Sequence, residues 1–145
     1  MINQKVSQII NKKIPGSVIV PEEPHNDYIQ LNAENWEEIA KFLKTDKNLL
    51  FDSCQCITGV DLGEDNDLEV RYNLHSMKQL HKIEIRIATE RKRPSVPSVE
   101  QIWRVADWLE REVYDMYGIT FKGHRDLRRM LLPEDWKGWP LRKDY

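Results

Sequence analysis

Two stretches near the middle of the chain decide the fold: LEVRYNL at residues 68–74 and HKIEIRIA at residues 81–88. In both stretches apolar side chains take every second position and mostly polar residues stand between them. The apolar positions are Val70, Tyr72 and Leu74 in the first stretch and Ile83, Ile85 and Ile87 in the second. A period of two is typical of strands with one buried and one solvated face. The short SMKQ segment at residues 76–79 therefore predicts an antiparallel hairpin.

The chain before the hairpin predicts two helices and two short strands. The first helix is expected over residues 3–13, with an apolar face formed by Val6, Ile9 and Ile10. Short strands are expected over residues 17–20 and 27–31, each bounded by turn-forming residues. The second helix is expected over residues 34–44, where apolar residues recur at helical spacing and Asn32 can act as the N-cap.

The chain after the hairpin predicts one long helix. Ser98 followed three residues later by Gln101 matches a capping box, which is a signal for a helix start. An apolar stripe then continues, so the helix is expected over residues 99–117. Gly118 is placed to end it, because glycine adopts the left-handed conformation found just past many helices.

These elements predict an α+β fold in which helices pack on a mostly antiparallel sheet. Residues 49–62 are apolar but loosely patterned, and residues 91–98 are interpreted as a loop. We divide the chain into an α+β domain at residues 1–118 and an extended, irregular C-terminal segment at residues 119–145.

Composition excludes several classes of protein. The chain has 145 residues and a net charge of -2, which gives no general attraction to nucleic acid. No apolar run approaches the roughly 20 residues of a membrane helix, so contact with a membrane is expected only through partners. The first residues lack the features of a signal or transit peptide, which predicts a cytosolic chain. Cys54 and Cys56 are too few for an iron–sulfur cluster or a structural zinc site.

The sequence contains few candidate catalytic groups. Glu112 and Asp115 are paired carboxylates on one predicted helix, which can perform acid–base chemistry but are also usual on a solvated helix face. His124 has no spaced partner of a known metal pattern, and no glycine-rich phosphate loop occurs. The sequence therefore predicts no active site in this chain.

The last residues instead have the composition of a binding segment. The stretch HRDLRRMLLPEDWKGWPLRKDY at residues 124–145 shows no sustained helical or strand period, yet it contains Trp136 and Trp139. Tryptophan and arginine dominate the energetics of many protein interfaces. A segment of this kind either wraps a partner or folds back on its own domain, and the spacing leaves both open.

The same region carries a family resemblance. Residues 106–145 contain E-R-E-x-Y-D-M-[FY]-G-I, followed by G-H-x-D-L-R-R-x-L-x-P-x-D-W-x-G-x-P-L-R-K-D-Y. This run closely resembles the C-terminal signature of the 30-kDa subunit family of NADH:quinone oxidoreductase, which is respiratory complex I. Arg125 departs from the pattern, because the family often has proline there.

The resemblance implies a non-catalytic core subunit of the peripheral arm of complex I, which passes electrons from NADH to quinone and couples this to proton translocation. The chain itself would bind no cofactor, since FMN, the iron–sulfur clusters and quinone belong to partner subunits. It would contact the hydrogenase-large-chain-like subunit and the neighbouring iron–sulfur subunits. Its location would be peripheral, at the cytoplasmic face of the bacterial inner membrane.

The motif positions are assigned to structure and partner contact, with none catalytic, metal-binding or cofactor-binding. They are Glu110, Arg111, Glu112, Asp115, Tyr117, Gly118, His124, Asp126, Arg128, Arg129, Pro133, Asp135, Trp136, Gly138, Pro140, Leu141, Arg142, Lys143 and Asp144.

Two alternatives stay open at this point. The first is the equivalent subunit of a related membrane-bound hydrogenase or of a complex fed by ferredoxin or F420. The second is a free-standing small enzyme that uses Glu112, Asp115 and His124, which would require a pocket where the three groups converge.

Overall fold

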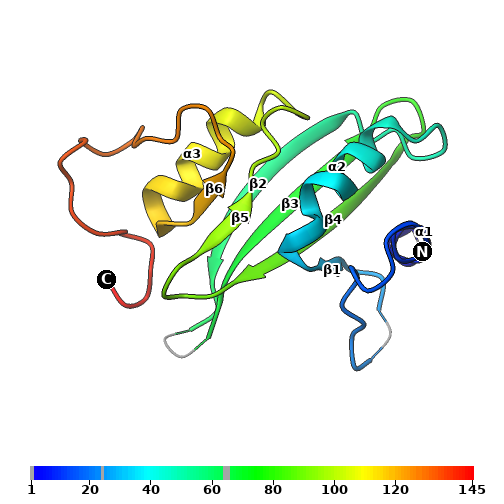
Figure 1. Ribbon diagram of the computed structural model, residues 1–145, viewed down its shortest axis with the longest axis horizontal. Coiled ribbons are helices and arrows are strands. Elements are labelled where there is room, and N and C mark those ends of the chain that lie inside the picture. The colour runs from blue at the N-terminus through cyan, green and yellow to red at the C-terminus, as the bar shows by residue number, and fades with distance from the viewer. Residues whose placement is uncertain (1, 24, 64–65) are drawn as a thin grey trace.

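A four-stranded sheet forms the centre of the computed structural model, which describes residues 2–23, 25–63 and 66–145 (Figure 1). The strands are β1 (Ile29–Leu31), β2 (Ser53–Asp61), β3 (Leu68–Ser76) and β4 (His81–Thr89), in the order β1-β4-β3-β2. β3 runs antiparallel to both of its neighbours, and β1 runs parallel to β4. The predicted α+β class with a mostly antiparallel sheet is therefore confirmed.

The predicted hairpin is β3 and β4. Their register is unbroken from the pair Leu68–Thr89 to the pair Ser76–His81. Tyr72 lies opposite Ile85, and both side chains are fully buried. The alternating apolar side chains therefore face the core as expected, because paired residues of neighbouring strands lie on the same side of a sheet.

β2 is a strand that the sequence pattern did not predict. Its pairing with β3 shifts at a bulge between Cys54 and Cys56, which breaks the period of two. Gly59 also lies in this strand, where a Cβ atom would stand 2.5 Å from the ring of Tyr117. Glycine leaves room for the helix that carries Tyr117 to approach the strand. It also replaces the larger apolar residue that would have identified this position as buried in the sequence pattern.

The helices are α1 (Ile2–Lys13), α2 (Trp36–Thr45) and α3 (Ala106–Tyr117), with a short 3-10 turn η1 (Ala33–Asn35) before α2. The apolar face expected for the first helix is partly wrong: Val6 and Ile10 are buried but Ile9 is 39% exposed. The expected cap is also wrong, because the amide of Asn32 makes no capping bond among the described residues and donates to the carbonyl of Gly16 instead.

The third helix begins later than expected. Residues 100–105 form turns and a bend, and α3 starts at Ala106. Ser98 does not form the predicted capping box, since its hydroxyl donates to Glu110 at 2.6 Å. Gly118 ends the helix as predicted, with a left-handed φ of 75° and an N–H that donates to the carbonyl of Tyr114.

A second, two-stranded parallel sheet joins α3 to the rest of the domain. It consists of β5 (Ser95–Pro97), inside the segment interpreted as a loop, and β6 (Thr120–Lys122), inside the predicted C-terminal segment. The expected strand at residues 17–20 is present only as a single bridge between Val18 and Leu31. The division of the chain at residue 118 stays a prediction.

One hydrophobic core connects the large sheet with the helices. The rings of Trp36 from α2 and Tyr72 from β3 lie 4.8 Å apart within it. Trp103 is also buried and donates from its indole N–H to the carbonyl of Phe51 at 2.8 Å. No helix in the described ranges is long and apolar enough to cross a membrane.

Candidate functional site

The last part of the chain loops around the outer side of α3, at the opposite end of the molecule from the N-terminus (Figure 1). We call residues 123–145 the tail. Its described residues form turns and bends and no helix or strand. Because the tail lacks regular backbone pairing, its shape depends on the groups that accept and donate hydrogen bonds along its path.

The first anchor of the tail is the buried carboxylate of Asp115, near the end of α3. One of its oxygens accepts the backbone N–H groups of Met130, Leu131 and Leu132 at 3.2, 2.7 and 3.0 Å. The other oxygen pairs with the guanidinium of Arg129 at 2.8 Å. A single carboxylate thus fixes three consecutive residues of the tail.

Arg129 extends this anchor into the next turn of the tail. Its guanidinium also donates to the carbonyl of Gly138 and lies 4.3 Å from the centre of the Trp139 ring. Trp139 in turn packs against Gly118, where a Cβ atom would stand 2.6 Å from the indole. The tail therefore passes close to the residue that ends α3, and glycine there provides both the space and the positive φ.

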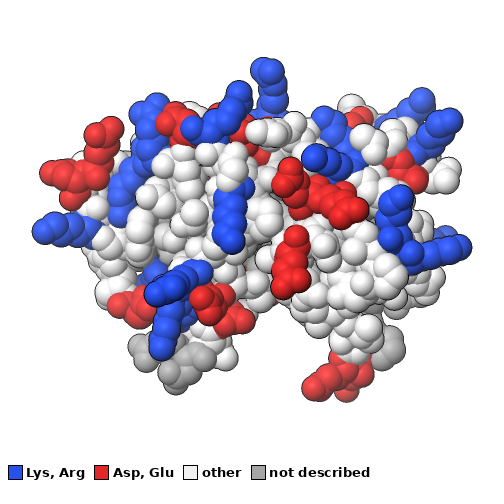
Figure 2. Space-filling view, in the orientation of Figure 1, with Lys and Arg blue, Asp and Glu red and all other residues white. Residues whose placement is uncertain are grey.

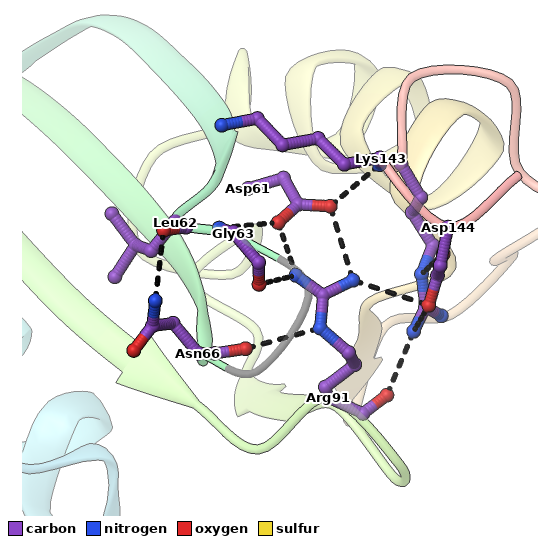
Figure 3. A network of polar contacts seen from close by, with 8 residues as sticks. Asp61, Leu62, Gly63, Asn66, Arg91, Lys143 and Asp144 are labelled. Atoms are coloured by element: carbon purple, nitrogen blue, oxygen red, sulfur yellow. Dashed lines mark hydrogen bonds and ion pairs between the residues drawn. The ribbon is translucent and has the colours of Figure 1, made fainter.

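The second anchor is an ion-pair network at the end of β2, shown in Figure 3. Arg91 forms a bidentate pair with Asp61, and the same carboxylate accepts the backbone N–H of Lys143 at 2.7 Å. Arg91 also donates to Asp144 at 3.2 Å. Arg142 donates to the carbonyl of Arg91 at 3.0 Å. The side chain and the backbone of Arg91 therefore both bind residues near the end of the tail.

Both anchoring carboxylates are held in the ionised form. The hydrogen bonds from Arg91 lower the pKa of Asp61 well below its usual range, against the opposing effect of burial. Burial alone would raise the pKa of Asp115, but Arg129 and the three backbone N–H groups outweigh it and lower that pKa. Both anchors are therefore formed at neutral pH.

The anchored backbone leaves apolar side chains in solvent. Leu131, Trp136, Leu141 and Tyr145 are 57%, 41%, 54% and 65% exposed. On the face turned to the viewer in Figure 2, basic and acidic side chains are interspersed, without a field of one sign. The tail thus presents apolar groups among mixed charges, which is the composition of a protein interface.

The predicted site residues fall into three groups. Two are buried and bonded within the chain: Glu110 and Asp115. Seven are half-buried: Arg111, Tyr117, Gly118, His124, Arg129, Pro140 and Arg142. The others are exposed: Glu112, Asp126, Arg128, Pro133, Asp135, Trp136, Gly138, Leu141, Lys143 and Asp144. The role of these residues in a partner interface stays a prediction.

Glu110 has a structural environment of its own. It is buried under α3, where it accepts hydrogen bonds from the hydroxyl of Ser98 and from the backbone N–H of Val99. Burial raises the pKa of Glu110 to about 7, although these two bonds oppose the rise. Glu110 therefore fastens the segment before α3 to the helix and does not face a surface.

The three groups of the possible enzyme do not converge. Asp115 is saturated by the tail, and Glu112 is exposed. His124 interacts through one ring nitrogen with the carbonyl of Asp107, and its other nitrogen accepts the N–H of Asp126. His124 is thus held at Asp107, and Asp107 and Asp115 are separated by about 12 Å along the helix axis, at 1.5 Å per residue.

No metal-binding constellation of His, Cys, Asp and Glu occurs within the described ranges. Cys54 and Cys56 are free thiols, and burial raises the pKa of Cys54 to about 12, which keeps it protonated.

Two residues of the second anchor were missed from the sequence. Arg91 stood in a basic stretch interpreted as a loop, and Asp61 stood at the end of a poorly patterned apolar run. They are 30 residues apart and no motif joins them. Arg125, the departure from the family pattern, pairs with the buried carboxylate of Glu100 at 3.0 Å.

Comparison with known proteins places the chain among respiratory subunits. Residues 29–145 match the family model described as "Respiratory-chain NADH dehydrogenase, 30 Kd subunit". An NADH-quinone oxidoreductase subunit of Chloroherpeton thalassium is 49% identical over 115 residues, which cover 79% of this chain and 48% of the relative. The subunit of the same name from Roseiflexus castenholzii is 37% identical over 144 residues, covering 98% and 83%. The chain thus spans about half the length of the first relative and most of the second.

Two solved structures share the fold. A trypsin-resistant fragment (1–134) of Nqo5 has a TM-score of 0.67 and 27% identity, and covers 88% of this chain and 100% of the fragment. A chain of an archaeal membrane-bound sulfane sulfur reductase has a TM-score of 0.77 and 20% identity, covering 100% and 86%. At this identity the second likeness concerns the fold alone.

Proposed function

We propose, from the premise that this chain belongs to the family of the respiratory-chain NADH dehydrogenase 30-kDa subunit, that it is a core subunit of the peripheral arm of an NADH:quinone oxidoreductase. Its role is to hold other subunits in place, and its own residues do not react. FMN, the iron–sulfur clusters and quinone are bound by the partner subunits, which carry the electrons and drive proton translocation.

The observation that carries the proposal is the anchored tail. Asp115 and Asp61 fix its backbone, while Leu131, Trp136 and Leu141 remain in solvent. Large apolar side chains that an anchored segment leaves exposed mark interaction sites, because their burial is favourable only against another molecule. Trp136 is the strongest candidate, since tryptophan is enriched among residues that dominate interface energies.

The proposed partners are the hydrogenase-large-chain-like subunit and the neighbouring iron–sulfur subunits. The mixed charges around the apolar residues suit a protein partner, and they argue against nucleic acid, which requires a basic face. The complex would hold the chain at the cytoplasmic face of the inner membrane, with no membrane contact of its own.

The test is recovery of the complex with a tagged chain. We expect wild-type chain purified from native membranes in mild detergent to bring down the cluster-bearing and hydrogenase-like subunits with NADH:quinone activity. Trp136→Ala should lower this recovery about tenfold or more, because loss of an interface hot spot costs at least about 2 kcal/mol. Recovery with hydrogenase activity in place of NADH:quinone activity would assign the chain to a related complex.

A matched control is available at the hairpin tip. Leu80 is 81% exposed in the turn between β3 and β4, and this turn lies at the opposite end of the molecule from the tail (Figure 1). Leu80→Ala should leave recovery unchanged, and neither substitution should lower the melting temperature of the isolated chain. If Trp136→Ala retained every subunit, the tail surface would not be the interface.

A further inference from the structure

Arg91 follows the last strand of the large sheet and lies outside the family motif, yet it is the centre of the network in Figure 3. Its guanidinium has five N–H donors, and every one of them has an acceptor. Two go to the carboxylate of Asp61 and one to Asp144. The others go to the carbonyls of Gly63 and Asn66.

These acceptors belong to different parts of the chain. Asp61 ends β2, and Gly63 and Asn66 lie in the connection that follows it. Asp144 is near the end of the tail. Arg91 therefore joins the tail to the sheet at a point about 50 residues away in sequence. The side chains of Arg91 and Asp61 are only 14% and 3% exposed, so solvent screens their pairing weakly, whereas the side chain of Asp144 is 41% exposed.

The tail contributes contacts to the same network. Arg142 bonds both the carbonyl of Arg91 and the carboxylate of Asp144. The backbone N–H of Lys143 bonds Asp61. Leu141 and Tyr145, two of the exposed apolar residues, lie directly beside these bonded positions in the sequence.

We infer that Arg91 is a positioning residue for partner binding: with Asp61, it holds residues 141–145 on the domain before any partner arrives. The partner then meets a preformed surface, and the tail is not ordered by the partner. This inference rests on the proposed function for its consequence in assembly. Preorganisation matters because ordering a mobile segment during binding lowers affinity.

The substitutions Arg91→Gln and Arg91→Lys test this in the full chain. Glutamine removes the charge, and lysine keeps the charge but has three donors in a different geometry. We expect trypsin to cleave after Lys137 and Lys143 slowly in the wild-type chain and at least about tenfold faster in Arg91→Gln. Arg91→Lys should fall between them. Arg93→Gln, a change at an exposed arginine two residues away, is the matched control and should behave as the wild type.

Two further readouts separate positioning from a general loss of stability. The thermal transition followed by tryptophan fluorescence should stay unchanged in Asp144→Asn, which loosens the tail but leaves the pair of Arg91 and Asp61 intact. In a double-mutant cycle, Arg91→Gln combined with Asp144→Asn should speed cleavage by less than the product of the two single effects, because the two substitutions remove one shared contact.

Assembly is measured by titrating each purified chain into membranes from a strain that lacks this subunit and following the recovery of NADH:quinone activity. The half-saturating concentration should rise about tenfold for Arg91→Gln and stay unchanged for Arg93→Gln. If the free wild-type tail were cleaved as fast as that of Arg91→Gln, the inference would be overturned and the proposed function would stand. If neither Arg91→Gln nor Trp136→Ala changed the titration, both would be overturned.

Discussion

The β3–β4 hairpin and the tail are stabilised in opposite ways. In the hairpin every described residue from Leu68 to Ser76 has a partner on the opposite strand, and one face is buried along its whole length. In the tail the backbone is held at a few points, chiefly by Asp115 and Asp61. The energy of the hairpin is thus distributed over many small contacts, while that of the tail is concentrated in two carboxylates.

This difference suits two roles. A sheet with distributed contacts tolerates changes on its polar face and keeps the domain rigid. An irregular segment held at points can turn its apolar side chains outward, since its backbone is satisfied by side chains beneath it. Substitutions should therefore act globally in the hairpin and locally in the tail.

The largest effect is expected from the core of the hairpin. Ile85→Ala should lower the free energy of unfolding by about 3–4 kcal/mol, because Ile85 is fully buried and the change leaves a cavity. Urea unfolding followed by circular dichroism measures it. Ile9→Ala, at a partly exposed isoleucine of α1, is the control and should lose much less. Equal losses in the two variants would contradict the buried register of the hairpin.

The next effect should be confined to the tail. Asp115→Ala leaves Arg129 and three backbone N–H groups without their acceptor, and loss of one partner of a buried pair costs about 3 kcal/mol. Amide hydrogen exchange should accelerate at residues 130–132 and remain slow in β3 and β4. Asp126→Ala, at an exposed carboxylate, should leave the exchange unchanged. Loss of protection throughout the sheet would show that the tail and the domain unfold together.

A smaller effect concerns pH and joins the two regions through α3. Glu110 keeps its proton up to about pH 7 in the folded chain but loses it near 4.5 when unfolded. The folded state then binds more protons between these values, so stability should fall as pH rises from about 4.5 to about 7. Glu110→Gln should remove this dependence, so that the free energy of unfolding of the variant stays constant from pH 5 to pH 8 while that of the wild type declines. Chemical unfolding at pH 5, 6, 7 and 8 measures it, and a parallel decline in the variant would contradict the assignment.

The smallest effect is expected at the surface of the tail. Arg128 pairs with Asp126, and both side chains are mostly exposed. Such pairs contribute little because water screens them. Arg128→Ala should leave the melting temperature unchanged, as measured by calorimetry. A clear decrease would mean that Arg128 anchors the tail in the way that Arg129 does.

Predictions from the sequence agreed with the structure where the element depends on local spacing and failed where it depends on neighbouring elements. The hairpin was predictable because Val70, Tyr72 and Leu74 repeat the geometry of a strand in the sequence itself. β2 was not predicted, because the bulge at Cys54 depends on the pairing with β3 and Gly59 is required by the approach of α3. Ser98 carried a valid capping signal, but the buried carboxylate of Glu110 in α3 competes for its hydroxyl.

The family signature was legible in the sequence, and it located the tail and two of the four tail residues that Asp115 holds, Arg129 and Leu131. The residues of the signature, however, do not show which side chains are buried in the folded chain. Asp115 and Arg129 proved to be internal bonds, and Trp136 and Leu141 proved to face solvent. Arg91 and Asp61 lay outside the signature altogether.

The sequence by itself determined the α+β class, the hairpin, the end of α3 at Gly118 and the family, since each depends on local spacing or on a run of adjacent residues. Only the tertiary structure decided how the tail lies and which of its residues remain free to meet a partner. The physical reason is that the tail is fixed by buried charges far away along the chain, and no periodicity connects residues that only folding brings together.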